Sequence, residues 1–119
     1  MEWQSIDALK QRLRQFAAQR DWDQFHSPKN LAMALTVEAS ELLEHFQWLS
    51  EEQSRTLDPD KLRKVAEEIA DVQIYLARLA DKLNVSIGEA VARKIELNEA
   101  KYPAEKVRGS MKKYSEYDL

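Results

Sequence analysis

Apolar residues recur at helical spacing along most of the chain, and no run alternates apolar and polar residues as a strand would. A serine or aspartate stands before each expected helix, where its side-chain oxygen can accept a free backbone N–H. These start signals are Ser5, Ser27 before Pro28, Asp58 before Pro59, and Ser86. The first helix is expected to end before the irregular segment 21–29, and the others near Trp48, Leu83 and Tyr102. The pattern therefore predicts an all-α fold.

The third predicted helix is apolar over more of its surface than one neighbour can cover. Its heptad stripe is Leu62, Val65, Ile69, Val72, Leu76, Leu79 and Leu83. Alanines and Ile74 widen this stripe to more than half of the circumference. Such a helix needs neighbours on two sides, so we expect four to five helices in a bundle completed by homo-oligomerisation. One domain is expected over residues 1–103, followed by a polar, partly basic tail over 104–119.

The composition limits the cellular location to be expected and the kinds of metal ligand that the chain can offer. The 119 residues suit one domain, and no apolar run approaches the roughly 18 residues of a membrane span. The first residues lack the features of a signal peptide, so a cytoplasmic location is expected. Cysteine is absent, which leaves carboxylates and two histidines as the strong metal ligands. A net charge of −3 gives no general attraction to nucleic acid.

Acidic residues occupy positions where an apolar core is expected. On the second predicted helix, Glu38 lies inside the arc of apolar side chains and Glu41 lies on its flank. On the third helix, either Glu67 or Glu68 shares a side with Asp71. Each helix thus offers an acidic pair at i,i+3 spacing, at which two side chains share a face.

Clustered carboxylates in a partly dry groove need a compensating cation or proton. Oxygen ligands without thiolate favour Mg²⁺, or Mn²⁺ in its place, and Mg²⁺ usually keeps positions for substrate phosphates. The alternative is that these acids form solvated faces or salt bridges with arginine or lysine from another helix.

Four sequence blocks resemble a known family. In chain order they are "RDWDQFHSPKNLAMAL", "EASELLEHFQW", "EEIADVQIYL" and "KIELNEAKYP". In this order they resemble the MazG-like all-α nucleoside triphosphate pyrophosphohydrolases, and within them the dCTP pyrophosphatase branch. The resemblance implies that Glu38, Glu41, Glu68 and Asp71 bind Mg²⁺, which selects Glu68 over Glu67. It also implies a helical bundle that forms a dimer or a dimer of dimers.

The implied reaction is Mg²⁺-dependent hydrolysis of a nucleoside triphosphate to the monophosphate and pyrophosphate. Carboxylates can hold both metal and water, and Glu41, with Glu38 beside it, is the candidate for orienting the attacking water. No glycine-rich phosphate loop is present, which excludes the P-loop mechanism.

Residues that bind the substrate are predicted partly from the resemblance. Trp22 and Trp48 match aromatic positions of the nucleotide pocket, where a base can stack, and His26 can bond the base or sugar. Asn98 and Tyr102 match positions near the substrate, and the amide of Asn98 can donate to and accept from a base edge. The alternatives are core or interface packing for the tryptophans, a capping or interface role for His26, and simple exposure for Asn98.

Basic residues near the end of the chain, including Lys101 and Lys113, can bind β- or γ-phosphate, or merely solvate a terminus. The sequence thus favours a housekeeping hydrolase of dCTP or 5-modified dCTP that binds neither nucleic acid nor membrane. A non-catalytic helical oligomer and a phosphoribosyl-ATP pyrophosphohydrolase remain alternatives.

Overall fold

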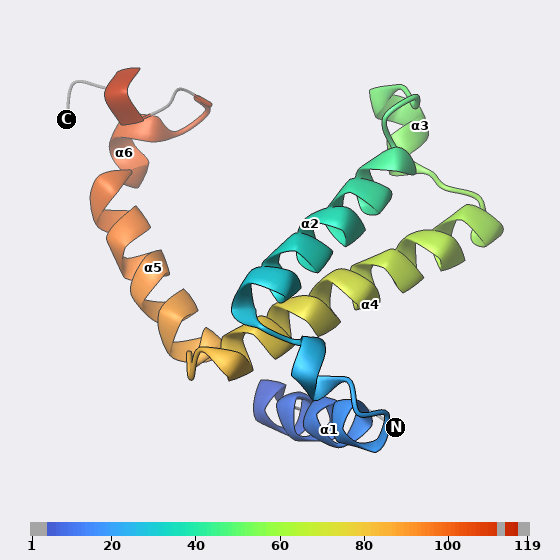
Figure 1. The fold of residues 1–119 in the computed structure, drawn as a ribbon. Coiled ribbons are helices and arrows are strands. Elements are labelled where there is room, and N and C mark those ends of the chain that lie inside the picture. Colours follow the sequence, from blue (N-terminus) through green and yellow to red (C-terminus); the bar gives the residue numbers. More distant parts are fainter. Residues whose placement is uncertain (1–4, 112–113, 117–119) are drawn as a thin grey trace. The chain divides into compact units, whose positions relative to one another are not determined.

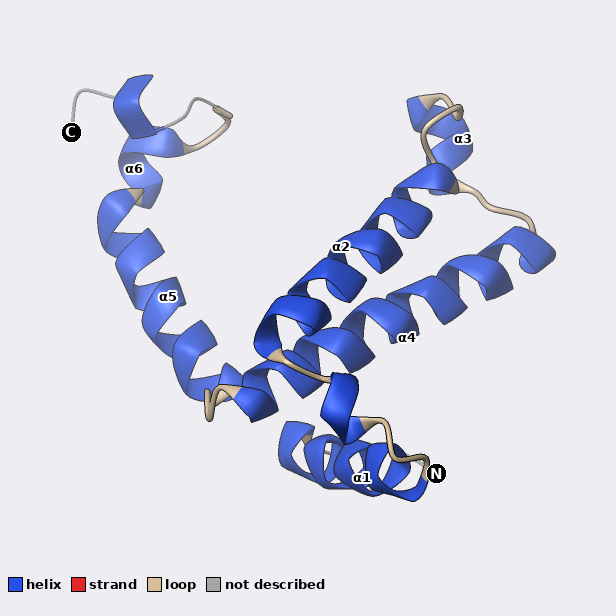
Figure 2. Ribbon diagram, in the orientation of Figure 1, coloured by secondary structure: helices blue, strands red, loops and turns tan. Residues whose placement is uncertain are grey.

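The computed structural model describes residues 5–111 and 114–116, and every regular element in these ranges is a helix (Figure 2). In chain order the elements are α1 (Ile6–Gln19), η1 (Asp23–Phe25), α2 (Pro28–Glu44), α3 (Glu51–Arg55), α4 (Pro59–Lys82), α5 (Ile87–Lys101), α6 (Ala104–Val107) and η2 (Tyr114–Glu116) (Figure 1). The all-α class predicted from the sequence is confirmed. The chain divides into two compact units, one up to Val85 and one from Ser86 onward, and each is described by itself.

The four predicted helix starts are confirmed. At each of them the side-chain oxygen accepts a backbone N–H three residues later, which satisfies one free donor of the first turn. The pairs are Ser5 with Ala8 at 3.1 Å, Ser27 with Asn30 at 3.1 Å, Asp58 with Lys61 at 2.8 Å, and Ser86 with Glu89 at 3.2 Å. Short-range capping chemistry therefore fixes where these helices begin.

The sequence prediction placed the end of the second helix too far along the chain. α2 stops at Glu44 and not near Trp48, because the next N–H groups bond to carbonyls three residues back. The N–H of His45 reaches the carbonyl oxygen of Leu42 at 3.2 Å, and that of Phe46 reaches Leu43 at 2.9 Å. These tighter turns end the α-helix, so Trp48 lies outside it.

The short helix α3 was not predicted. It begins at a reciprocal capping box, in which Ser50 Oγ accepts the N–H of Gln53 and Gln53 Oε1 accepts the N–H of Ser50. This Ser-x-x-Gln pattern is visible in the sequence, and it satisfies two free donors at once.

In the first unit, α2 and α4 run antiparallel and side by side, with α1 packed against α4 (Figure 1). The connection through α3 turns the chain back between them. The buried apolar residues come from all three helices: Ala17, Leu31, Val65, Ala77 and Ala80. A residue near the middle of α2 therefore faces the middle of α4.

One row of apolar residues on α4 remains exposed in the single chain. Its members recur every seven residues and are between 39% and 55% exposed: Leu62, Ile69, Leu76 and Leu83. The residues Val65, Ala77 and Ala80 of the same helix are buried. The wide apolar surface of this helix, expected from the sequence, is thus present and is covered on one side.

The second unit contains α5, α6 and η2. On α5, Val91 and Ile95 are about half exposed, whereas Ile87 and Tyr102, the latter just past the last turn, are partly covered. The predicted boundary between a domain over 1–103 and a tail over 104–119 stays a prediction. Among the described helices of both units, none has the length and apolar character needed to cross a membrane.

Candidate active site

Three glutamates from the paired helices form a cluster of carboxylates. α2 contributes Glu38 and Glu41, and α4 contributes Glu68. One carboxylate oxygen from each residue lies within 4.8 Å of the other two, and all three side chains are partly buried. The antiparallel packing of α2 and α4 brings these residues together although 27 or more positions separate the two helical pairs in sequence.

Two oxygens of this cluster are buried without compensation. Glu38 Oε2 and Glu68 Oε2 are inaccessible to solvent, and neither has a hydrogen-bond partner within residues 5–111 and 114–116. Buried polar atoms nearly always have a partner, because an unsatisfied one costs about 1–3 kcal/mol and more when it is charged. The cluster therefore lacks a compensating group, a cation or a proton, among the residues that the structure describes.

The electrostatics of Glu38 agree with this arrangement. Burial, contact with the carboxyl groups of Glu68 and Glu41, and the charge of Asp71 raise the pKa of Glu38 to about 7. In the absence of a cation, repulsion among like charges favours a proton on this carboxyl. A bound cation would reverse that preference.

The three clustered ligands offer only carboxylate oxygen. Such donors suit hard cations, Mg²⁺ and Mn²⁺, better than Zn²⁺, which favours nitrogen and sulfur. Of the four ligands predicted from the sequence, the structure brings Glu38, Glu41 and Glu68 together. Asp71 lies close enough to raise the pKa of Glu38 but is not one of the three clustered residues.

A cavity of about 90 Å³ opens in the same unit and includes two predicted substrate residues, Trp22 and His26. Both come from the irregular segment between α1 and α2. The other lining residues are Leu13, Phe16, Ala17, Ile74, Tyr75 and Arg78. The rings of Phe16 and Trp22 meet edge to face, with centroids 5.8 Å apart, which sets the orientation of the tryptophan.

The cavity and the carboxylate cluster lie along one side of α4. Asp71, Tyr75 and Arg78 follow each other at i, i+4 and i+7, a spacing that places side chains on a common helix face. At about 1.5 Å per residue, Asp71 and Arg78 are separated by roughly 10 Å along the helix axis. A ligand can thus contact both places at once.

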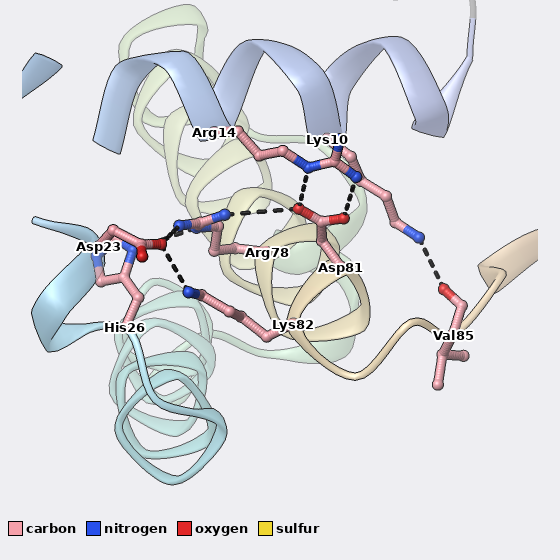
Figure 3. Close-up of polar contacts among 8 residues, drawn as sticks. All are labelled: Lys10, Arg14, Asp23, His26, Arg78, Asp81, Lys82 and Val85. Atoms are coloured by element: carbon pink, nitrogen blue, oxygen red, sulfur yellow. Dashed lines mark hydrogen bonds and ion pairs between the residues drawn. The ribbon is translucent and has the colours of Figure 1, made fainter. Parts of the chain in front are cut away.

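A network of charged residues borders the cavity (Figure 3). Arg78 donates from Nε to His26 Nδ1 at 3.2 Å and from Nη2 to Asp23 Oδ1 at 2.5 Å. Lys82 also donates to Asp23, at 2.6 Å, and this bond is the main reason why the pKa of Asp23 is lowered. Arg78 also lies 3.5 Å from a carboxylate oxygen of Asp81.

The sequence reasoning did not identify Arg78. The signal was available, because an arginine within the apolar stripe of a helix must find buried partners. Its partners Asp23 and His26 lie more than 50 positions away, and only the fold brings them together.

The remaining predicted substrate residues are Trp48 of the first unit and four residues later in the chain. Trp48, which the structure describes, is 86% exposed and does not line the cavity. Asn98, Lys101 and Tyr102 belong to the second unit, at or just after α5. There the Nζ of Lys101 lies 5.7 Å from the centroid of the Tyr102 ring. Lys113 is outside the described residues.

Comparisons with known proteins agree on one family. The model of the MazG-like family matches residues 33–117, which include the four acidic residues. The dCTP pyrophosphatase 1 of Mus musculus is 39% identical over 114 residues, covering 94% of this chain and 67% of that protein. The Homo sapiens protein of the same name gives the same values.

A solved structure extends the similarity to the fold. It is the crystal structure of a pyrophosphatase from Archaeoglobus fulgidus, which matches with a TM-score of 0.74 at 42% identity. The match covers 87% of this chain and 96% of the other. The resemblance to MazG-like pyrophosphohydrolases, and within them to the dCTP branch, is confirmed. The chain therefore belongs to the MazG-like family and is an enzyme of the pyrophosphohydrolase class.

Proposed function

We propose that the chain hydrolyses nucleoside triphosphates, and preferentially dCTP or 5-modified dCTP, to the monophosphate and pyrophosphate with Mg²⁺ as cofactor. The observation that carries this proposal is the cluster of Glu38, Glu41 and Glu68, with two buried oxygens lacking a partner in the described part of the chain. The similarity to proteins named dCTP pyrophosphatase supports the choice of nucleotide. Removal of surplus or modified deoxynucleotides in the cytoplasm is the proposed role.

In this proposal Glu38, Glu41, Glu68 and Asp71 hold the cation. A bound Mg²⁺ supplies positive charge that neutralises the phosphates and lowers the pKa of a coordinated water. Glu41 is partly exposed at the cluster and accepts a hydrogen bond from the attacking water, so that one lone pair of the water points at phosphorus. Glu38 assists, since its carboxylate lies in the same cluster.

The cavity beside Trp22 and His26 is the proposed site of the base. Its lining is mostly apolar and aromatic, with His26 and Arg78 as the polar groups, which suits a flat ring with a few polar edges. An indole face provides stacking worth about 1–3 kcal/mol per base. The position of the cavity along α4 lets the phosphates extend from there toward the carboxylates.

Further residues are proposed to bind the nucleotide, on the strength of the resemblance. Asn98 and Tyr102 are separated by one helical turn and lie on the same side as Ile87 and Val91. We propose that they contact the nucleotide, that Lys101 and Lys113 contact its phosphates, and that Trp48 stacks on it. The resemblance of Asn98, Tyr102 and Trp48 to family positions near the substrate supports their part of this assignment, and the positive charge of the two lysines supports theirs.

We also propose a homo-oligomer, either a dimer or a dimer of dimers. The support is the exposed heptad row on α4, since four large apolar side chains in one line are costly to leave in water. Light scattering on the purified protein, coupled to size-exclusion chromatography, checks the mass. A monomer at micromolar concentration would contradict this part.

The function is tested by pyrophosphate release from a panel of ribo- and deoxynucleoside triphosphates, with Mg²⁺ and with a chelator. We expect release that depends on the metal and is fastest with dCTP or its 5-substituted forms. Equal rates with all bases would contradict the proposed base site but would still agree with the proposed metal site. No release from any triphosphate or from phosphoribosyl-ATP would contradict the enzymatic proposal.

A further inference from the structure

Arg78 is the least explained charged residue of the first unit. It is 5% exposed, although burying a guanidinium is costly unless every contact is favourable. Both carboxylates near it have another cation as partner: Asp23 has Lys82 at 2.6 Å, and Asp81 has Arg14 at 2.5 Å. Charge compensation by itself therefore does not require Arg78. What Arg78 adds is the hydrogen bond from its Nε to His26 Nδ1.

That hydrogen bond determines which nitrogen of His26 carries the proton. A guanidinium is always protonated and can only donate, so His26 Nδ1 must accept. In a neutral imidazole the other nitrogen, Nε2, then holds the proton. Burial and the charge of Arg78 lower the pKa of His26, which keeps the ring neutral. Nε2 makes no hydrogen bond with any residue that the structure describes.

The orientation of the guanidinium is itself fixed from three elements (Figure 3). Asp23 of η1 accepts from Nη2 at 2.5 Å, and Asp81 of α4 lies 3.5 Å from Nη1. Arg14 of α1 holds Asp81 through two bonds of 2.7 and 2.5 Å. With both Nη groups engaged, the plane of the guanidinium leaves Nε–H directed at His26.

We propose that Arg78 is a positioning residue that fixes His26 as the Nε2–H tautomer, so that His26 presents a hydrogen-bond donor to a base in the cavity. Such a donor favours cytosine, whose adjacent N3 and O2 both accept, over thymine or uracil, whose N3 carries a proton. Arg78 thereby sets base selectivity without touching the base. This inference rests on the proposed function, because it takes the ligand of the cavity to be a nucleobase.

The tautomer can be read directly from long-range ¹H–¹⁵N correlation spectra of the full chain without metal or nucleotide. The two histidines are distinguished by the His45→Gln variant. We expect wild-type His26 to be protonated on Nε2, and Arg78→Met, which has similar length but no donor, to shift protons to Nδ1. Lys82→Met is the matched control: it also removes a cation from Asp23 but leaves the bond from Arg78 to His26, so the tautomer should stay unchanged.

Base selectivity is the second measurement. In Arg78→Met the ratio of kcat/KM for dCTP to that for dTTP should fall by up to about tenfold, the equivalent of one lost hydrogen bond. Lys82→Met should keep the wild-type ratio. A wild-type His26 protonated on Nδ1, or an unchanged ratio in a folded Arg78→Met variant with an altered tautomer, would overturn the inference.

These outcomes are separable from failure of the proposed function. A wild-type enzyme that does not distinguish dCTP from dTTP would overturn the selectivity, whereas the spectrum would still report the tautomer. If Arg78→Met does not fold, Arg78→Leu replaces it, since Leu is also apolar and has no N–H to donate to His26 Nδ1. The same loss of the Nε2–H tautomer is then expected, and its persistence would overturn the role of Arg78.

Discussion

Two acidic groups at α4, one around Asp81 and one around Glu68, differ in whether the chain compensates their charge. Asp81 has a side chain only 9% exposed, and the guanidinium of Arg14 beside it lowers the pKa of that carboxyl. Glu68, thirteen residues earlier, has a buried oxygen without a partner in residues 5–111 or 114–116, and the pKa of its neighbour Glu38 is raised to about 7. One group is complete within the chain. The other has no compensating partner among the residues that the structure describes.

The comparison shows how an acid whose charge the chain compensates differs from one on the same helix whose charge it does not compensate. Charge compensation from the chain makes Asp81 part of the scaffold that holds α1 and η1 against α4. Glu38 and Glu68 lack such compensation within the described residues, so a metal bound there, as proposed, would affect stability as well as activity.

The largest effect is expected from Glu38→Gln. This change removes a proposed metal ligand, and even outer-shell changes at metal sites cost about 10–100-fold, so turnover should fall by more than about 100-fold. Asp71→Asn should also abolish turnover with the fold retained. The measurement is Mg²⁺-dependent pyrophosphate release from dCTP. Glu67→Gln, next to Glu68 but exposed, is the control and should keep near-wild-type activity.

The second largest effect, a loss of stability, is expected from Asp81→Asn. This change removes the negative charge that pairs with Arg14 and Arg78. Removing one partner of a buried pair costs about 3–5 kcal/mol, and the exposure of Arg14 reduces this to roughly 2 kcal/mol. Urea denaturation of the metal-free protein measures the free energy of unfolding. An unchanged midpoint would show that the Asp81 network does not stabilise the first unit.

The pH dependence of stability should have opposite signs in the two groups. Asp81 has a lowered pKa, so its stabilisation is present above the pKa of the unfolded state, near 4, and is lost as pH falls below it. Glu38 has a raised pKa, so the metal-free protein loses stability as pH rises from about 4.5 to about 7.

Metal-free Glu38→Gln should therefore become more stable than wild type over the interval in which Glu38 ionises, and Mg²⁺ should remove that advantage. Thermal unfolding at pH 5 and pH 8, with and without Mg²⁺, tests both statements. A variant that is no more stable than wild type at pH 8 would contradict the repulsion at Glu38.

The smallest effect is expected from Lys82→Met. Asp23 is 57% exposed, and surface ion pairs are worth about 0–1 kcal/mol. Arg78 still contacts Asp23 in this variant. The free energy of unfolding should change by less than about 0.5 kcal/mol, measured by the same urea titration. A loss of unfolding free energy as large as that of Asp81→Asn would show that the contact between Lys82 and Asp23 stabilises the fold as a buried pair does.

Much of the fold was predictable because its signals are local. Ser27, Asp58 and their following prolines place two helix starts without reference to the rest of the chain. The end of α2 was not predictable in the same way, since three-residue hydrogen bonds after Glu44 have no comparable signal. α3 was not predicted, although the capping-box pattern of Ser50 and Gln53 indicates a helix start there.

The site was predictable only in part. Helical spacing and the resemblance identified the acids, and the packing of α2 against α4 brings Glu38, Glu41 and Glu68 together. Arg78 was not predicted as a site residue, because its contacts with Asp23 and His26 form only in the folded chain. Asp71, Trp48, Asn98 and Tyr102 stay predictions, since each depends on a cation, a nucleotide or the second unit.

The most direct test of the central claim, that the uncompensated carboxylates bind a divalent cation, is titration of the metal-free protein with Mn²⁺, followed by electron paramagnetic resonance without nucleotide. We expect Mn²⁺ to bind the wild type and Glu67→Gln, and binding to be lost or greatly weakened in Glu68→Gln. Binding by Glu68→Gln equal to that of the wild type would show that the cation is held elsewhere.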